Sequence, residues 1–167
     1  MSQRALKELL RGQGSHADPI ACIEDISAEE AARHIAGSPH SIGQILSHMN
    51  YWMRYELQRI RDESPRYPEH NAESFPPAPS PADAREWDVM RQDFGRLLAE
   101  YAILAESSEH EMQRELPRAS DADQKVAGTL EAVLWQMVVH NSYHVGQIAL
   151  IRRVLGAWPP RGGGDTW

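Results

Sequence analysis

The sequence predicts an all-α protein, a four-helix bundle with a long crossover between its second and third bundle helices. Three segments, residues 41–61, 81–106 and 129–155, repeat apolar residues at steps of three and four, the spacing of one helix face. A proline-rich stretch separates the first two segments. The 167-residue chain is 41% hydrophobic and has a single cysteine, which fits a packed core without a disulfide. We therefore expect residues 1–167 to form one domain.

The amino-terminal part contains shorter helical segments. Residues 2–11 and 19–26 read as two helical pieces separated by a Gly-Gln-Gly sequence. Ser27 followed by Glu30 has the spacing of a capping box and predicts another short helix to about residue 35. We expect the 19–26 region, with or without the earlier turns, to supply the fourth element of the bundle.

The second bundle helix is predicted over residues 41–61. Ser41 and Gln44 have the capping-box spacing, in which each side chain accepts a hydrogen bond from the other residue's backbone N–H. Apolar residues then follow at helical steps along one face: Ile42, Leu46, Met49, Met53, Leu57 and Ile60.

Residues 63–80 are rich in proline and predict a crossover loop, one that is long for a helix bundle. Extended, it would span roughly 55–60 Å, more than the roughly 30–40 Å of the flanking helices. The loop is therefore long enough to run the length of the bundle and leave those helices parallel. We expect Tyr67 and Phe75 to pin it to the surface.

The third bundle helix is predicted over residues 81–106. Ser80 is the expected N-cap, Pro81 suits the first turn, and Asp83 favours the positive end of the helix dipole. The apolar positions fit the seam of a bundle: Trp87, Met90, Phe94, Leu97, Tyr101 and Leu104.

The last helix is predicted over residues 129–155, ended by Gly156 and followed by a tail over residues 157–167. Its seam is apolar except for two residues near the middle, Asn141 and His144. Polar residues inside an apolar stripe need a physical explanation.

Composition limits the classes of function. The net charge is -7 and no basic cluster stands out, which argues against nucleic-acid binding. No apolar run is long enough to cross a bilayer, and the first residues lack the apolar centre of a signal peptide. We expect a cytoplasmic protein without a membrane partner. Its abundance of aromatic residues favours a homodimer.

Three histidines form a candidate metal site. His140 and His144 are four residues apart, so on a helix both imidazoles leave the same face. This pair alone is a weak signal, because buried hydrogen-bonded histidines are common. His48 lies on the flank of the apolar face of its own helix, near mid-length. If the two helices are neighbours, three imidazoles meet at one level, and coordination would offset their desolvation.

The sequence resembles the DinB/YfiT-like superfamily. Residues 140–148, HNSYHVGQI, continue into Arg152-Arg153 and residues 155–159, LGAWP, like the last helix of that family. Residues 39–42, PHSI, lead to residues 48–52, HMNYW, like its second helix. The similarity covers nearly the whole chain, including the proline-rich crossover. It implies a four-helix bundle with a long link between its second and third helices.

The resemblance also implies a metal held by three histidines, which map onto His48, His140 and His144. Imidazole suits zinc and nickel, and also ferrous iron, so the ligand type does not choose among them. Three protein ligands leave a position for water or substrate, the pattern of catalytic rather than structural zinc sites. Relatives include S-transferases that use low-molecular-weight thiols, and hydrolase-like members. We therefore expect a small-molecule substrate, with two alternatives: a non-catalytic, stress-associated binding protein, or a structural bundle in which the histidines only pack.

Candidate helpers are fewer. The zincin pattern is absent because Asn141, not a glutamate, follows His140, so the sequence assigns no general base. Asn141 is a candidate to orient a ligand, equally well explained as a buried hydrogen-bonding residue. Gln44 and Gln147 lie within a turn of ligands, although a packing or surface role is the simpler interpretation of each. Asn50 and Tyr143 are expected to point away and line the rim.

Two further groups are expected to be inert. Cys22 reads as a small buried residue rather than a reactive thiol. The remaining histidines are expected in solvent: His16, His34, His40, His70 and His110, with His40 a partial exception because it lies just before the metal-bearing helix.

Overall fold

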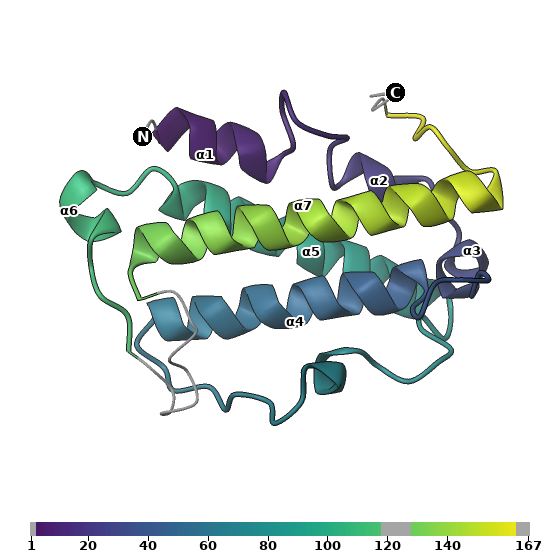
Figure 1. Cartoon of the computed structure of the whole chain (residues 1–167), viewed down its shortest axis with the longest axis horizontal. Helices are drawn as coiled ribbons and strands as arrows, with labels where there is room; N and C mark the ends of the chain where they lie inside the picture. The colour runs from purple at the N-terminus through teal and green to yellow at the C-terminus, as the bar shows by residue number, and fades with distance from the viewer. Residues whose placement is uncertain (1–2, 118–127, 163–167) are drawn as a thin grey trace.

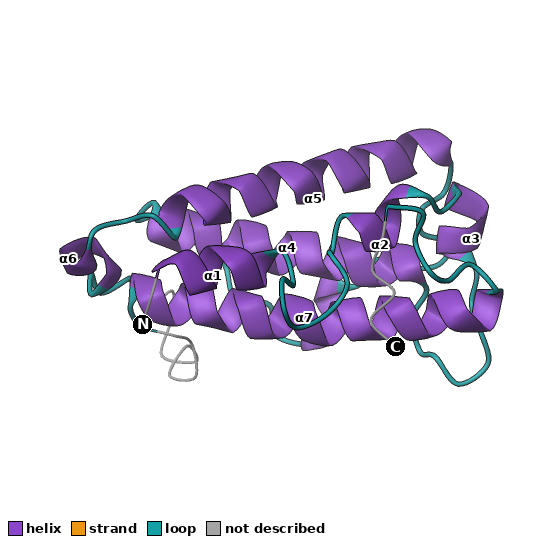
Figure 2. Ribbon diagram, turned by 90° about the horizontal axis from the view of Figure 1, so that it is seen from above, coloured by secondary structure: helices purple, strands orange, loops and turns teal. Residues whose placement is uncertain are grey.

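The computed structural model describes residues 3–117 and 128–162, and every regular element in these ranges is helical. Figure 1 shows the long helices side by side, and Figure 2 shows α3 and α6 at opposite ends of the bundle. The elements are α1 (Gln3–Leu10), α2 (Ala21–Glu24), α3 (Ala28–Ala32), α4 (Ile42–Ile60), the 3-10 helix η1 (Asn71–Ser74), α5 (Ala84–Leu104), α6 (Glu109–Met112) and α7 (Leu130–Leu155).

Helix α4 begins where the capping box predicts. The Ser41 side chain accepts from the Gln44 backbone, and the Gln44 side chain accepts from Ser41. The six predicted seam residues of α4 are all buried in the core. Helix α3 begins with a second capping box, between Ser27 and Glu30, as predicted.

Helix α5 begins later than predicted. Its N-cap is Asp83, whose carboxylate accepts from the Glu86 backbone, and not Ser80. The Ser80 carbonyl instead accepts from the Ser41 hydroxyl at 3.0 Å, so the residues before α5 bind the start of α4. This close approach requires Gly43, because a Cβ there would collide with the Ser80 backbone.

Helices α4 and α5 run in the same direction. Residue pairs between them advance together along both helices: Asn50 with Met90, Arg54 with Asp93, and Arg61 with Glu100. The connecting chain therefore returns along the whole length of α4 before α5 starts, as Figure 1 shows. Tyr67 contacts Trp52 and Tyr55 with ring centroids 5.6 and 5.8 Å apart, and this aromatic cluster fastens the crossover to α4.

Helix α7 runs antiparallel to α4 and carries the polar interruption into the core. It begins at the N-cap Thr129 and ends at Gly156, which adopts a left-handed conformation with φ 73°. Asn141 and His144 are 3% and 6% exposed. The predicted start and end of this helix are confirmed.

The fourth side of the bundle differs from the prediction. Helix α1 packs on α7 and α5, whereas the 19–26 region provides only the four-residue α2. The chain turns between them through Gly12 and Gly14, both at positive φ. The longer amphipathic segment is therefore the main fourth element, because it has more apolar surface to bury.

Further predictions concern Cys22, membrane-spanning helices and the carboxyl-terminal tail. Cys22 is fully buried, as predicted. Within the described ranges, no helix is long and apolar enough to span a membrane. Residues 163–167 of the predicted tail lie outside the described residues. The homodimer and the cytoplasmic location stay predictions.

Candidate metal centre

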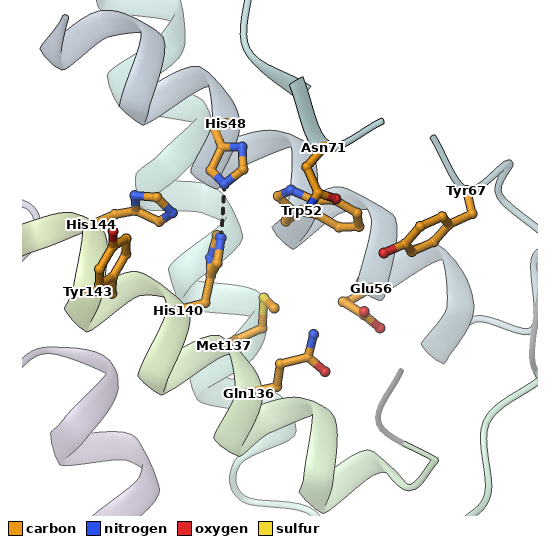
Figure 3. A pocket seen from close by; sticks show the side chains of 10 residues that line it. All are labelled: His48, Trp52, Glu56, Tyr67, Asn71, Gln136, Met137, His140, Tyr143 and His144. Atoms are coloured by element: carbon orange, nitrogen blue, oxygen red, sulfur yellow. Dashed lines mark hydrogen bonds between the residues drawn. The ribbon is translucent and has the colours of Figure 1, made fainter. Parts of the chain in front are cut away.

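His48, His140 and His144 converge on one point between α4 and α7, as Figure 3 shows. The Nε2 atoms of His48 and His140 are 3.1 Å apart. One ring nitrogen from each of the three side chains lies within 4.8 Å of the others. His48 and His144 are 7% and 6% exposed, and His140 is half-buried.

The proton on His48 can be placed from its neighbours. Its Nδ1 lies 2.6 Å from the Ser74 hydroxyl, which lies 2.5 Å from the backbone carbonyl of Asn71. A carbonyl only accepts, so the single hydroxyl proton goes to Asn71 and the hydroxyl oxygen accepts from His48 Nδ1–H. A neutral His48 therefore presents the lone pair of Nε2 to the site.

His144 is oriented in the same way by a different group. Its Nδ1 lies 2.7 Å from the side-chain oxygen of Gln147. An amide oxygen accepts, so His144 carries its proton on Nδ1. Its Nε2 is therefore unprotonated and has a free lone pair. The other end of the Gln147 amide donates to the Tyr143 hydroxyl at 3.3 Å.

His140 is the ligand that is held least tightly. Because His48 Nε2 is an acceptor, His140 Nε2 donates to it across the 3.1 Å gap. To present a lone pair there, His140 has to carry its proton on Nδ1 instead. The side-chain oxygen of Asn141 lies 3.4 Å from that nitrogen and is placed to accept it.

All three imidazoles resist protonation. Burial lowers the pKa of His48 to about 3, and the neighbouring His144 and His140 add to the effect. Burial likewise lowers the pKa of His140 to about 4 and lowers the pKa of His144, in the latter case against the Gln147 hydrogen bond. At neutral pH the site therefore offers neutral nitrogen donors, the form that binds a metal.

A cavity of about 320 Å³ opens beside the histidines. Aromatic rings and one thioether form much of its wall, and Figure 3 shows them around the imidazoles. Tyr143, at 64% exposure, stands at the rim, with its ring centroid 5.1 Å from that of His144. The lining residues are His48, Trp52, Glu56, Tyr67, Asn71, Gln136, Met137, His140, Tyr143 and His144.

The donor set fits a divalent transition metal ion. Two imidazole nitrogens on a tetrahedral ion with bonds of about 2.0–2.1 Å stand roughly 3.3 Å apart. The Nε2 atoms of His48 and His140 already lie near that separation, at 3.1 Å, and one nitrogen of each ring lies within 4.8 Å of the others, so ring rotations can bring all three onto one ion. These three residues form the one group of this kind in the described parts of the chain. Packing alone does not explain three neutral donors that point inward at one another.

The predicted helpers divide into two groups. Gln147 and Asn141 contact ring nitrogens of ligands, whereas Gln44 does not contact a ligand. The Gln44 amide donates to the Pro76 carbonyl at 2.8 Å, so it holds the crossover against α4. The prediction that Asn50 lines the rim is wrong: it is 2% exposed and donates to the Met90 carbonyl of α5.

Two of the histidines expected in solvent are engaged. His16 contacts the Ser142 hydroxyl at 2.8 Å, which links the turn after α1 to α7. His40 stacks on Phe75 with ring centroids 3.8 Å apart, and Phe75 stacks on His48 at 4.0 Å. Both contacts join segments far apart in sequence, so no local pattern predicts them.

Ser74 is the site residue that the sequence did not suggest. It lies in η1, a short element within the proline-rich segment, and nothing in its spacing relates it to a histidine on α4. A weak signal existed in Phe75, predicted to pin the crossover, because the residue before an anchoring side chain also lies close to the bundle.

Comparisons with known proteins identify the family. Neither the curated proteins nor the solved structures give a significant match. The family model described as DinB family matches residues 1–162, which include all three histidines and the crossover. The helical architecture and the histidine cluster agree with that match. The chain belongs to the DinB family.

Proposed function

We propose that this protein is a divalent-metal-dependent enzyme of the DinB/YfiT-like type, a thiol S-transferase or a hydrolase acting on a small molecule. The observation that carries the proposal is the convergence of His48, His140 and His144 at the wall of a cavity of about 320 Å³. That volume is within the range of small-molecule sites. Zinc and nickel suit the three imidazoles best, and ferrous iron is compatible with them.

The chain's own residues supply the conditions for such chemistry. A bound divalent ion would lower the pKa of a water or a thiol that it held. Trp52, Tyr67 and Met137 provide apolar surface that limits water around the reacting group. The Nδ1 contacts of His48 and His144 fix which nitrogens face the cavity. Tyr143 brings a phenol into ring contact with His144, at the rim where a substrate would enter.

A second candidate is a metal-containing protein that binds a ligand without turnover. It is favoured because the described residues of the cavity wall offer no evident general base. The carboxylate in the described cavity wall belongs to Glu56, which is 1% exposed and pairs with buried Arg59 at 2.5 Å. A carboxylate held in this way is poorly placed to exchange protons with a substrate.

One experiment separates these candidates. Zinc- and nickel-loaded protein is assayed for transfer of low-molecular-weight thiols to an electrophile such as monochlorobimane, and for hydrolysis of nitrophenyl esters. Turnover that disappears in the His48→Gln, His140→Gln, His144→Gln triple variant supports the enzyme. Metal-dependent binding of the thiols without turnover on either substrate class supports the binding protein.

A further inference from the structure

The crossover contributes a buried polar group to the metal site. Most of residues 61–73 are exposed or half-buried, yet Ser74 is 3% exposed. Its hydroxyl lies between two partners, His48 Nδ1 at 2.6 Å and the Asn71 carbonyl at 2.5 Å. A buried serine in a proline-rich connection is placed there by those contacts, because burying an unpaired hydroxyl is costly.

Two further contacts fix the position of the Ser74 hydroxyl. Phe75 stacks on the His48 ring with a 10° angle between the planes. Gln44 donates to the Pro76 carbonyl at 2.8 Å. Residues 74–76 thus each bind α4 or its histidine, through a hydroxyl, a ring and a carbonyl. Two of these residues, Ser74 and Phe75, contact His48, the side chain that would ligate the ion.

We propose that Ser74 is the positioning residue for His48: it holds the His48 proton on Nδ1 and so keeps Nε2 available to a metal. This inference rests on the proposed metal binding. A residue that orients a metal-ligating histidine in this way typically contributes 10–100-fold to metal affinity. Because binding free energies are reciprocal, an ion bound to His48 also stabilises the seating of residues 71–76 on α4.

The chain offers a matched control in Ser80. It lies further along the same crossover, at its carboxyl-terminal end, and is also 3% exposed, but within the described residues its hydroxyl has no hydrogen-bond partner. Ser74→Ala and Ser80→Ala therefore remove the same atom from equally buried positions, and the first alone removes a contact with a histidine. Ser74→Thr keeps the hydroxyl and serves as the rescue variant.

The first test uses metal-free protein and records the ¹⁵N chemical shifts of the His48 ring by NMR. Wild type and Ser80→Ala should show the Nδ1–H tautomer of His48, and Ser74→Ala a mixture of both tautomers. Wild-type His48 in the Nε2–H form would overturn the inference. This result does not depend on metal, so it stands even if the proposed metal binding fails.

The second test measures affinity for Co²⁺ from its visible absorption, together with amide hydrogen exchange of residues 71–76. Ser74→Ala should bind Co²⁺ 10–100-fold more weakly, while Ser80→Ala and Ser74→Thr stay within about threefold of wild type. Co²⁺ should slow exchange in residues 71–76 of wild type. Equal affinity of Ser74→Ala and wild type would overturn the inference, whereas wild type that binds no Co²⁺ would contradict the proposed function instead.

Discussion

Helix α7 carries two buried polar groups that differ in how they are satisfied. Near its end, Arg152 is 1% exposed and its guanidinium donates to the Cys22 and Ala157 carbonyls and to the Asp25 carboxylate, at 2.6–2.8 Å. Roughly two to three turns earlier, His140 and His144 meet His48 with nitrogen facing nitrogen. The first group has partners of opposite character within the protein, whereas the second brings together three ring nitrogens, each able to ligate a metal once its proton is on the other nitrogen.

This difference separates a structural site from a candidate functional one. The contacts of Arg152 join α2, α7 and the residues after α7, and they leave nothing for a ligand to add. In the imidazole cluster, the Nδ1 atoms of His48 and His144 are hydrogen-bonded by Ser74 and Gln147. The ring nitrogens on the cavity side converge on a point that suits a cation. A buried polar cluster therefore indicates ligand binding when several potential metal-ligating atoms converge on one point.

The largest expected effect comes from breaking the structural group. Arg152→Met leaves the Cys22 and Ala157 carbonyls without their buried donor and removes one of the two donors of the Asp25 carboxylate, so it should lower the free energy of unfolding by about 3 kcal/mol. Urea denaturation measures it. Arg153→Met is the control, because that side chain is exposed and stacks over Trp158 at 4.4 Å. If the free energy of unfolding falls by the same small amount in both variants, Arg152 does not have the structural role assigned to it.

The next effect distinguishes the two groups by their response to metal. Zn²⁺ at 100 times its dissociation constant should add about 2.7 kcal/mol to the free energy of unfolding of wild type. Arg152→Met should gain the same increment, because its defect is remote from the histidines. The His48→Gln, His140→Gln, His144→Gln variant should gain nothing. A similar gain in the triple variant would place the metal elsewhere.

The third effect is a dependence of stability on pH. The lowered pKa values of His48 and His140, about 3 and about 4, keep both neutral in the fold while the unfolded chain takes up protons below about pH 6.5. Metal-free protein should therefore lose stability as the pH falls from about 6.5 to 4, by up to about 1.4 kcal/mol per pH unit for each histidine. Denaturation across this range checks the slope, which should be much shallower in the triple variant. An equal slope in both proteins would assign the proton uptake to other groups.

The smallest effect compares two glutamines on α7. Gln147→Leu removes the acceptor of His144 Nδ1–H and should weaken Zn²⁺ binding about tenfold. Gln136→Leu alters an exposed residue of the same cavity wall and should leave affinity within about threefold. Competition with a chromophoric chelator gives both constants. Equal affinities would mean that Gln147 does not orient its histidine.

Much of the helical fold follows from local sequence patterns. Both capping boxes, the seams of α4, α5 and α7, and the left-handed Gly156 depend on residues within a few turns of one another. Periodicity also placed His140 and His144 on one face and His48 on the flank of its own helix, and the family resemblance implied that all three are metal ligands. The start of α5 was misplaced because Ser80 and Asp83 are both acceptable caps, and the choice depends on a contact with Ser41.

The remaining features depend on tertiary contacts that no spacing encodes. Helix α1, and not the 19–26 region, forms most of the fourth side of the bundle, because α1 packs on both α5 and α7. Ser74 reaches His48 through a connection whose path is set by several anchors, Phe75 among them. The sequence places Asn50 at the rim, but its hydrogen-bond partner is the Met90 carbonyl of α5. In each case the deciding contact joins residues that are distant in sequence.

The most direct test of the central claim is the metal content of the untagged protein, measured by mass spectrometry of the elements beside the triple histidine variant. We expect close to one zinc, nickel or iron ion per wild-type chain and essentially none in the variant, with both proteins helical by circular dichroism. A metal-free wild type that also takes up no ion on dialysis, or a variant that retains a full equivalent, would contradict the account.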